Sequence, residues 1–290
     1  MEDNKFSEMV IAGTIPIKGL GLTRGNVEIS FDNIRFYNEN IPENTVQIPI
    51  SMGTATLVAS CYKTLQYFNR SNELVAILAG DIGDGEGSTK IYEEISRLNN
   101  KFLIVHYIKP KISEITKIDF ERNFVVGDAG GMYAGKAAGI GDEFKLFLPD
   151  VGELAFLADK DSSHPAYVRG FISEVDDLDV IKLIKMAYET GKMPENMVIK
   201  GETDYIVQNG EIIATVSEPK HAAMECIGGT GDNLTGIISG LIYCGYEISE
   251  ACTLGCMVNR EIANMVTPTP DTKINEIIEA IPDALNKLID

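Results

Sequence analysis

Residues 226–241 read Cys-Ile-Gly-Gly-Thr-Gly-Asp-Asn-Leu-Thr-Gly-Ile-Ile-Ser-Gly-Leu, a glycine turn that runs into an apolar segment. Glycines adopt positive φ and have no Cβ, so their backbone N–H groups can close around an anion. The first turn of a helix adds unpaired N–H groups and a positive dipole end, which favour phosphate. From Thr230 onward the apolar side chains have helical spacing, at Leu234, Ile237, Ile238 and Leu241. The stretch therefore predicts a phosphate site at the start of a helix.

Asp232 stands directly after this turn, where a carboxylate would meet a hydroxyl group that is being phosphorylated. The alternative is an ordinary helix N-terminus, in which Thr230 or Asp232 serves only as a cap. Glycine costs up to about 1 kcal/mol relative to alanine within a helix, yet the segment contains Gly236, Gly240 and Gly245. These glycines indicate a buried helix that packs closely on a neighbour, as expected behind a binding site.

The run from Gly228 to Leu241 resembles the C-terminal signature of the ribokinase-like superfamily. Within that superfamily, the motif most resembles that of the NAD(P)H-hydrate dehydratase (YjeF C-terminal) family of carbohydrate-kinase-like proteins. The resemblance implies an α/β fold with a central, mainly parallel sheet and helices on both faces. It also implies Asp232 as catalytic base and a nucleotide-binding turn formed by Gly228, Gly229, Thr230, Gly231 and Asn233.

A second marker is residues 145–154, Lys-Leu-Phe-Leu-Pro-Asp-Val-Gly-Glu-Leu, in which a strand leads into a helix. Asp150 at the cap and Glu153 three residues later have nearly the spacing of a capping box, which alone would explain both acids. The motif Asp150-Val151-Gly152-Glu153 is intermediate between the Pro-His-Pro-Gly-Glu motif of the dehydratases and the Asn-x-x-Glu motif of sugar kinases. The resemblance implies that Glu153 holds the Mg²⁺ of the nucleotide and that Asp150, which replaces the family histidine, faces the substrate.

A third marker is Lys200, which with Gly201 ends the strand predicted over residues 196–201. Members of the family end this strand in the same Lys-Gly pair, ahead of a loop that faces the nucleotide. A lysine at the carboxyl edge of a sheet can reach phosphate, although a solvated strand-end lysine is equally common. By resemblance, Lys200 is a nucleotide ligand.

Two further strand ends supply candidate substrate ligands. The buried apolar run 74–79 ends at Gly80 and Asp81, where the family has a loop that lines the substrate pocket; a solvated turn is the alternative. Asp128 follows the strand predicted over residues 123–126. The family has Asp-Ala-Asp-Ala-Leu-Asn there, so this chain keeps one acid and loses the rest.

Strand and helix patterns alternate through the middle of the chain, which indicates βαβ units and a parallel sheet. Asn209 and Gly210 predict a hairpin between residues 205–207 and 211–216, and amphipathic helices are expected over 248–265 and 274–289. We expect one domain of 290 residues. Residues 1–50 read as a divergent strand-rich extension, suited to a lid or to contacts in a homo-oligomer.

The net charge of −18 argues against nucleic acid and against an anionic membrane as partners. The five cysteines have no metal-binding spacing, and Cys252 and Cys256 are expected in the core. An odd cysteine count, the absence of a signal peptide and the absence of a membrane-spanning run predict a cytoplasmic protein.

Together these patterns predict phosphoryl transfer to the hydroxyl group of a small molecule. The resemblance implies that ADP or ATP is the donor, together with Mg²⁺. In the dehydratase family, the hydroxyl of hydrated NAD(P)H is phosphorylated and phosphate is then eliminated, which repairs the coenzyme. A kinase of a carbohydrate or another small alcohol is the alternative. A non-catalytic nucleotide-binding relative is a second alternative, against which the presence of Asp232 argues.

Overall fold

The computed structural model describes residues 6–36, 46–51, 53–160 and 177–289. Within these residues eleven strands form one sheet, in the order β11-β10-β9-β8-β7-β6-β1-β5-β2-β3-β4. The six central strands pair in parallel: β1 (Met9–Ile15), β5 (Leu74–Gly80), β6 (Phe102–His106), β7 (Phe124–Gly127), β8 (Leu146–Phe147) and β9 (Asn196–Ile199). Antiparallel strands extend both edges: β10 (Asp204–Gln208) and β11 (Glu211–Val216) at one, β2 (Thr23–Ser30), β3 (Asn33–Phe36) and β4 (Gln47–Pro49) at the other.

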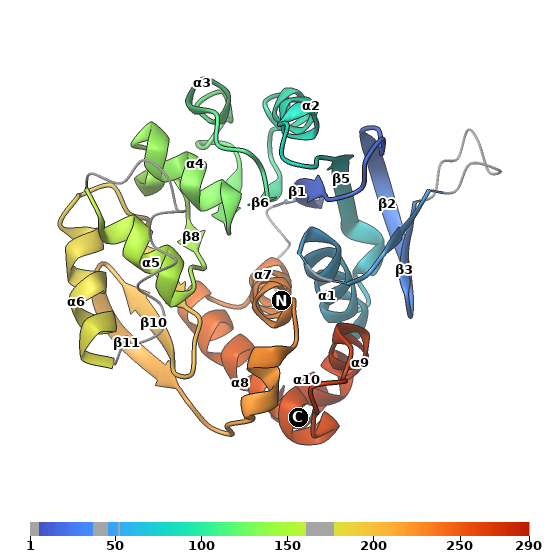
Figure 1. Cartoon of the computed structure of the whole chain (residues 1–290), viewed down its shortest axis with the longest axis vertical. Helices are drawn as coiled ribbons and strands as arrows, with labels where there is room; N and C mark the ends of the chain where they lie inside the picture. Colours follow the sequence, from blue (N-terminus) through green and yellow to red (C-terminus); the bar gives the residue numbers. More distant parts are fainter. Residues whose placement is uncertain (1–5, 37–45, 52, 161–176, 290) are drawn as a thin grey trace.

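Helices cover both faces of the sheet, which confirms the predicted α/β class (Figure 1). Because side chains alternate along a strand, Met9 and Ile11 of β1 enter one core while Val10 and Ala12 enter the other. The first core lies under α1 (Thr54–Tyr67), α7 (Thr230–Tyr243), α8 (Ile248–Val266), α9 (Ile274–Glu279) and α10 (Ile281–Ile289). The opposite face carries α2 (Glu86–Ile95), α3 (Ile112–Ile115), α4 (Gly130–Ala138), α5 (Val151–Ala158) and α6 (Asp177–Tyr188).

The N-terminal strand corrects one prediction, because β1 is not part of an extension. It lies in the middle of the sheet and pairs in parallel with both β5 and β6. Its continuous apolar run is buried on both faces, which is typical of a central parallel strand. The strand-rich interpretation holds for β2, β3 and β4, which form an antiparallel edge beyond β5; residues 37–45 lie outside the described part.

The C-terminal segment corrects a second prediction, because the single helix expected over residues 274–289 is two helices. The first ends at Glu279, and the second begins at Ile281 with Pro282 in its first turn. Proline has no N–H group and its ring clashes with the preceding turn, so it starts a helix well and continues one poorly. The hairpin predicted at Asn209 and Gly210 is confirmed by the antiparallel pairing of β10 with β11.

The glycines of α7 allow it to pack closely against α1. A Cβ on Gly236 would lie 2.6 Å from Cβ of Ser60, and one on Gly240 would lie 2.6 Å from Cγ2 of Thr64. This confirms the predicted close packing at these two positions. Gly245 has a different reason for being glycine, since it follows the end of the helix with φ +102°.

We expect Gly236→Ala to lower the free energy of unfolding by about 1–3 kcal/mol, because an added methyl group would overpack the contact between α1 and α7. Urea unfolding measures the change. Gly21→Ala is the control, because an added Cβ there meets nothing within 4 Å and the residue is exposed. Equal unfolding midpoints for Gly236→Ala and the parent would show that the two helices separate easily.

The carboxyl ends of the parallel strands form the edge at which a site is expected. Among the parallel strands, β5 follows β1 in the chain and lies on one side of it, and β6 comes next and lies on the other side. Ligands of open α/β sheets bind where the strand order reverses in this way. His106 ends β6 at this point, and Asp128 follows the end of β7. Among the described residues, no helix is both long and apolar enough to cross a bilayer.

Candidate functional site

A cavity of about 540 Å³ lies over the carboxyl ends of the strands, within the range usual for small-molecule sites. It brings together seven residues that the sequence singled out, from four separate elements. They are Asp128 after β7, Asp150 and Glu153 at the start of α5, Lys200 after β9, and Thr230, Gly231 and Asp232 at the start of α7.

The glycine turn has the geometry predicted for an anion site. Gly229 is the N-cap of α7 with φ +99°, a conformation that favours glycine. The N–H of Asn233 donates to the carbonyl of Gly229 at 2.8 Å. That bond is the first of the helical ladder, so the N–H groups of Thr230, Gly231 and Asp232 precede it and have no helical acceptor. Gly228 and Gly229 precede Thr230 in the chain but do not line the cavity.

The carboxylate of Asp232 is held at both oxygens. The N–H of Gly53, at the start of α1, donates to Oδ2 at 2.8 Å, and Nε2 of His106 lies 3.0 Å from Oδ1. Burial opposes ionisation, but His106, Lys200 and the Gly53 N–H outweigh it and hold the pKa of Asp232 below its usual value. The positive ends of α1 and α7 also favour the anion. Asp232 is therefore ionised in a partly buried position.

Asp128 is fully buried, and every lone-pair direction of its carboxylate is used. Nζ of Lys200 donates to Oδ1 at 3.0 Å and lies 3.1 Å from Oδ2. The N–H of Ala129 donates to Oδ1 at 2.8 Å, and Oγ1 of Thr235 donates to Oδ2 at 2.6 Å. Burial alone would lower the pKa of Lys200, but Asp128 and Glu153 outweigh it and raise that pKa. The Lys200 ammonium group therefore remains charged at the cavity wall.

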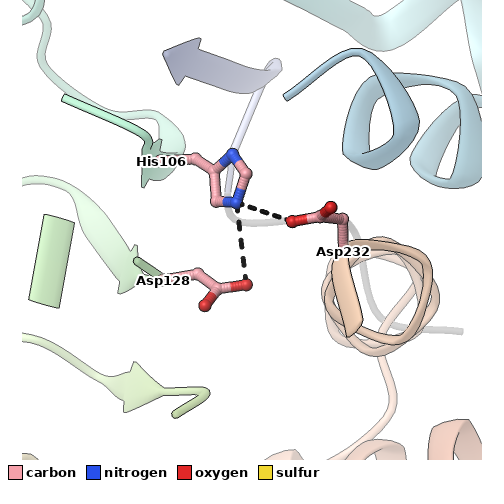
Figure 2. Close-up of side chains that lie close together, drawn as sticks. All are labelled: His106, Asp128 and Asp232. Atoms are coloured by element: carbon pink, nitrogen blue, oxygen red, sulfur yellow. Dashed lines mark ion pairs between the residues drawn. The ribbon is translucent and has the colours of Figure 1, made fainter. Parts of the chain in front are cut away.

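Figure 2 shows His106 between Asp128 and Asp232, with Nε2 toward both carboxylates. One ligand atom from each of the three lies within 4.8 Å of the others, a spacing that a metal ion could use. The carboxylate of Asp128 is already saturated by Lys200, Thr235 and Ala129, so a cation would have to displace Lys200. The three side chains therefore form a buried network of ion-pair contacts.

Glu153 and Asp150 form the capping box that the sequence suggested. The N–H of Glu153 donates to Oδ1 of Asp150 at 2.7 Å, and the N–H of Asp150 donates to Oε2 of Glu153 at 2.9 Å. The hydroxyl of Tyr133 donates to Oε1 of Glu153 at 2.7 Å. Burial raises the pKa of Glu153 to about 7, despite the opposing charge of Lys200, and the nearby Asp128 and Asp150 add to the effect. A divalent cation would offset this cost, and carboxylate oxygens are the ligands that Mg²⁺ prefers.

Besides Gly228 and Gly229, three more predicted ligands do not line the cavity. The side chain of Asn233 is buried between α1 and α8, where it accepts from Ser60 at 2.6 Å and donates to Asn259 at 2.8 Å. Neither Gly80 nor Asp81 lines the cavity. Burial opposes ionisation of Asp81, but donors from its own loop outweigh it and lower its pKa to about 2: the N–H groups of Gly85, Gly83 and Ser88 and the Ser88 hydroxyl. Asp81 thus organises the turn that follows β5.

The sequence did not single out His106, Tyr107, Gly53 or Thr235, which complete the site. Tyr107 lines the cavity with about half of its surface exposed, and its φ is +32°. Ala129, directly after Asp128, also has positive φ, at +44°. Such strain in non-glycine residues concentrates at functional sites. The one feature of the sequence that could have pointed to His106 is that a histidine ends an otherwise apolar strand, residues 102–106.

Comparisons with known proteins match about half of this chain to one family. The NAD(P)H-hydrate dehydratase family of carbohydrate kinases matches residues 143–283. An uncharacterized protein of Methanocaldococcus jannaschii, MJ1337, is 54% identical over 80% of this chain and all of its own length. An ADP-dependent (S)-NAD(P)H-hydrate dehydratase of Haloterrigena turkmenica is 31% identical, over 33% of this chain. The aligned part spans only 36% of that relative.

The fold has solved counterparts as well. A variant of phosphofructokinase-2 from Escherichia coli superposes with a TM-score of 0.56 at 13% identity, over 97% of this chain and all of the other. At that identity the likeness concerns the fold alone. The chain therefore shares the fold of this kinase, and residues 143–283, which carry Glu153, Lys200 and Asp232, match the NAD(P)H-hydrate dehydratase family.

Proposed function

We propose that this protein catalyses phosphoryl transfer from ADP or ATP to a small-molecule hydroxyl, and that the substrate is hydrated NAD(P)H. The observation that carries the proposal is the position of Asp232. Asp232 lies in the first turn of α7, directly after the glycine turn, and its ionised carboxylate lines the cavity. A protein that only bound nucleotide would gain nothing from a negative charge beside the phosphates.

The reaction follows from the groups around this carboxylate. The substrate hydroxyl gives its proton to Asp232 as its oxygen attacks the terminal phosphorus of the nucleotide. The bond from that phosphorus to the leaving phosphate oxygen breaks, and the new P–O bond forms. The N–H groups at the start of α7 and the ammonium of Lys200 stabilise the charge on the transferred group. Elimination of the phosphate from phosphorylated hydrated NAD(P)H would then restore the dihydronicotinamide.

Glu153, with Asp150 beside it, would hold the Mg²⁺ of the nucleotide, directly or through water. When bound, the ion would neutralise part of the phosphate charge. The observation that favours this placement is a half-buried carboxylate at the cavity wall whose pKa is raised to about 7. Phosphate oxygens enter the cavity more easily beside a cation than beside an uncompensated carboxylate.

Phosphorylation of a small alcohol without elimination is the second candidate. The segment after β7 favours it, because Asp128 is locked by Lys200 and Thr235 and the other acids of the dehydratase pattern are absent. The test is turnover of hydrated NADH with ADP or ATP and Mg²⁺, followed by the recovery of NADH absorbance. Phosphorylation of a panel of small alcohols is measured in parallel. Transfer to an alcohol without repair of hydrated NADH would select the kinase.

We expect Glu153→Gln to raise the Mg²⁺ concentration needed for half-maximal turnover by at least about tenfold, because glutamine lacks the charge that attracts the ion. The amide can keep the hydrogen bonds to Asp150 and Tyr133, so thermal unfolding should change little. Glu86→Gln is the control, since Glu86 lies in the first turn of α2 and is exposed. Identical Mg²⁺ titrations for Glu153→Gln and the parent would leave Glu153 with a capping role only.

A further inference from the structure

His106 is a fully buried polar side chain whose Nε2 faces the site. It ends β6, and Nε2 lies 3.0 Å from Oδ1 of Asp232 and 3.9 Å from Oδ2 of Asp128. The contact with Asp128 is too long for a hydrogen bond, and the contact with Asp232 is not aligned as one, so among the described residues Nε2 has ion-pair contacts only. A buried polar atom without an aligned partner is costly, and such an atom at a site calls for a functional reason.

The other ring nitrogen fixes where the protons of His106 lie. Nδ1 is 3.0 Å from Oγ1 of Thr54, and that hydroxyl donates to the carbonyl of Thr14 at 2.9 Å. A hydroxyl that donates its one proton to a carbonyl can only accept from the imidazole. Nδ1 therefore carries a proton. A second proton must lie between Nε2 and Asp232, because two facing lone pairs at 3.0 Å would repel each other.

The charged and titratable groups around the ring come from four elements. Asp232 approaches from α7 and Asp128 from the end of β7, while Lys200 from the end of β9 binds Asp128. Tyr107, next in the chain, packs edge-on with its ring centroid 4.4 Å away. Lys200 already neutralises Asp128. Of the two carboxylates that face His106, Asp232 is therefore the one that is not ion-paired with Lys200.

We propose that His106 is the positioning residue of the catalytic base: its imidazole, with Nε2 3.0 Å from Oδ1 of Asp232, holds that carboxylate fixed toward the cavity. The Gly53 N–H holds Oδ2 on the other side, so the carboxylate cannot rotate. Thr54 fixes the ring through Nδ1, in the way that a base is oriented by a third group in other catalytic sites. The inference rests on the proposed function for Asp232, and it concerns a residue that does not itself line the cavity.

The first arm of the test measures the ring nitrogens directly and requires no substrate. The chain has three histidines, so ¹⁵N-labelled protein gives few imidazole signals, and the His106→Gln spectrum identifies those of His106. We expect Nε2 of His106 to carry a proton, and its signal to shift in Asp232→Asn while those of the other histidines do not. A bare Nε2, or an unchanged signal in Asp232→Asn, would overturn the inference.

The second arm measures kcat and KM as functions of pH for His106→Gln and His106→Leu. Glutamine keeps an N–H donor near Asp232, whereas leucine removes it. We expect kcat to fall by about 10²-fold in His106→Leu and less in His106→Gln, with the KM for nucleotide nearly unchanged. Since His106 lowers the pKa of Asp232, its removal moves the acid limb of the kcat profile to higher pH. The loss should therefore be largest at acid pH and shrink as the pH rises.

Ser239→Ala provides the matched control, because Ser239 is a fully buried polar residue of the same helix as Asp232 and its hydroxyl has no partner within the described chain. It should leave turnover, the pH profile and the His106 signals unchanged. If His106 only filled space in the core, His106→Leu would lower the stability of the protein without moving the acid limb of the kcat profile. That result would refute the proposal. If the parent protein turns over none of the substrates, the proposed function fails, and the nitrogen spectra still decide whether His106 holds Asp232.

Discussion

Asp232→Asn is expected to lower turnover by about two to four orders of magnitude while leaving nucleotide affinity unchanged or slightly tighter. An amide cannot accept the hydroxyl proton, so the step that Asp232 performs is lost. The same substitution removes a negative charge close to the bound phosphates, which does not weaken nucleotide binding. The measurement pairs turnover of hydrated NADH, and of small alcohols, with calorimetric titration of ADP and ATP in the presence of Mg²⁺.

The competing explanation of Asp232 as a plain helix cap predicts the opposite pattern. Asparagine caps helices about as well as aspartate, so activity would survive. Asp283→Asn is the control, because Asp283 is an exposed acid in the first turn of α10. Turnover of Asp232→Asn close to that of the parent, on any substrate the parent accepts, would remove Asp232 from the mechanism.

Asp128→Ala is expected to lower the free energy of unfolding by about 3–5 kcal/mol, the usual cost of removing one partner from a buried ion pair. The side chain of Lys200 is only 12% exposed, and its ammonium group would lose the carboxylate that it binds through both oxygens. Thr235 and the N–H of Ala129 would lose their acceptor as well. Chemical unfolding measures the loss.

The double variant Asp128→Ala with Lys200→Met distinguishes this cause from a simple cavity. Methionine keeps the stem of the lysine and removes its charge, so no uncompensated ammonium remains. The double variant should be less destabilised than the sum of the two single variants, by at least about 1 kcal/mol. Additive losses would mean that Lys200 reaches solvent when Asp128 is absent, and that the pair contributes little.

The sequence by itself determined the features that are written in a short run of residues. The turn and helix at residues 226–241 followed from glycine, a helical apolar period and an acid in the first turn, and α7 begins at Thr230. The capping box at Asp150 and Glu153 and the hairpin at Asn209 and Gly210 depend on neighbours three or fewer residues apart. The α/β class followed from the alternation of such local patterns, and the resemblance supplied the order of the markers.

Only the tertiary structure decided which of these features meet. The central place of β1 depends on pairing with β5 and β6, and an apolar run has the same sequence pattern in the middle of a sheet as at its edge. The contacts that build the site join residues far apart in sequence: Lys200 and Asp128 are separated by 72 positions, Thr235 and Asp128 by 107, and Gly53 and Asp232 by 179. Periodicity says which face of an element is buried, but not which partner covers it. His106 therefore read as an ordinary end of a buried strand, and its role emerged only when the strand order placed it beside Asp232.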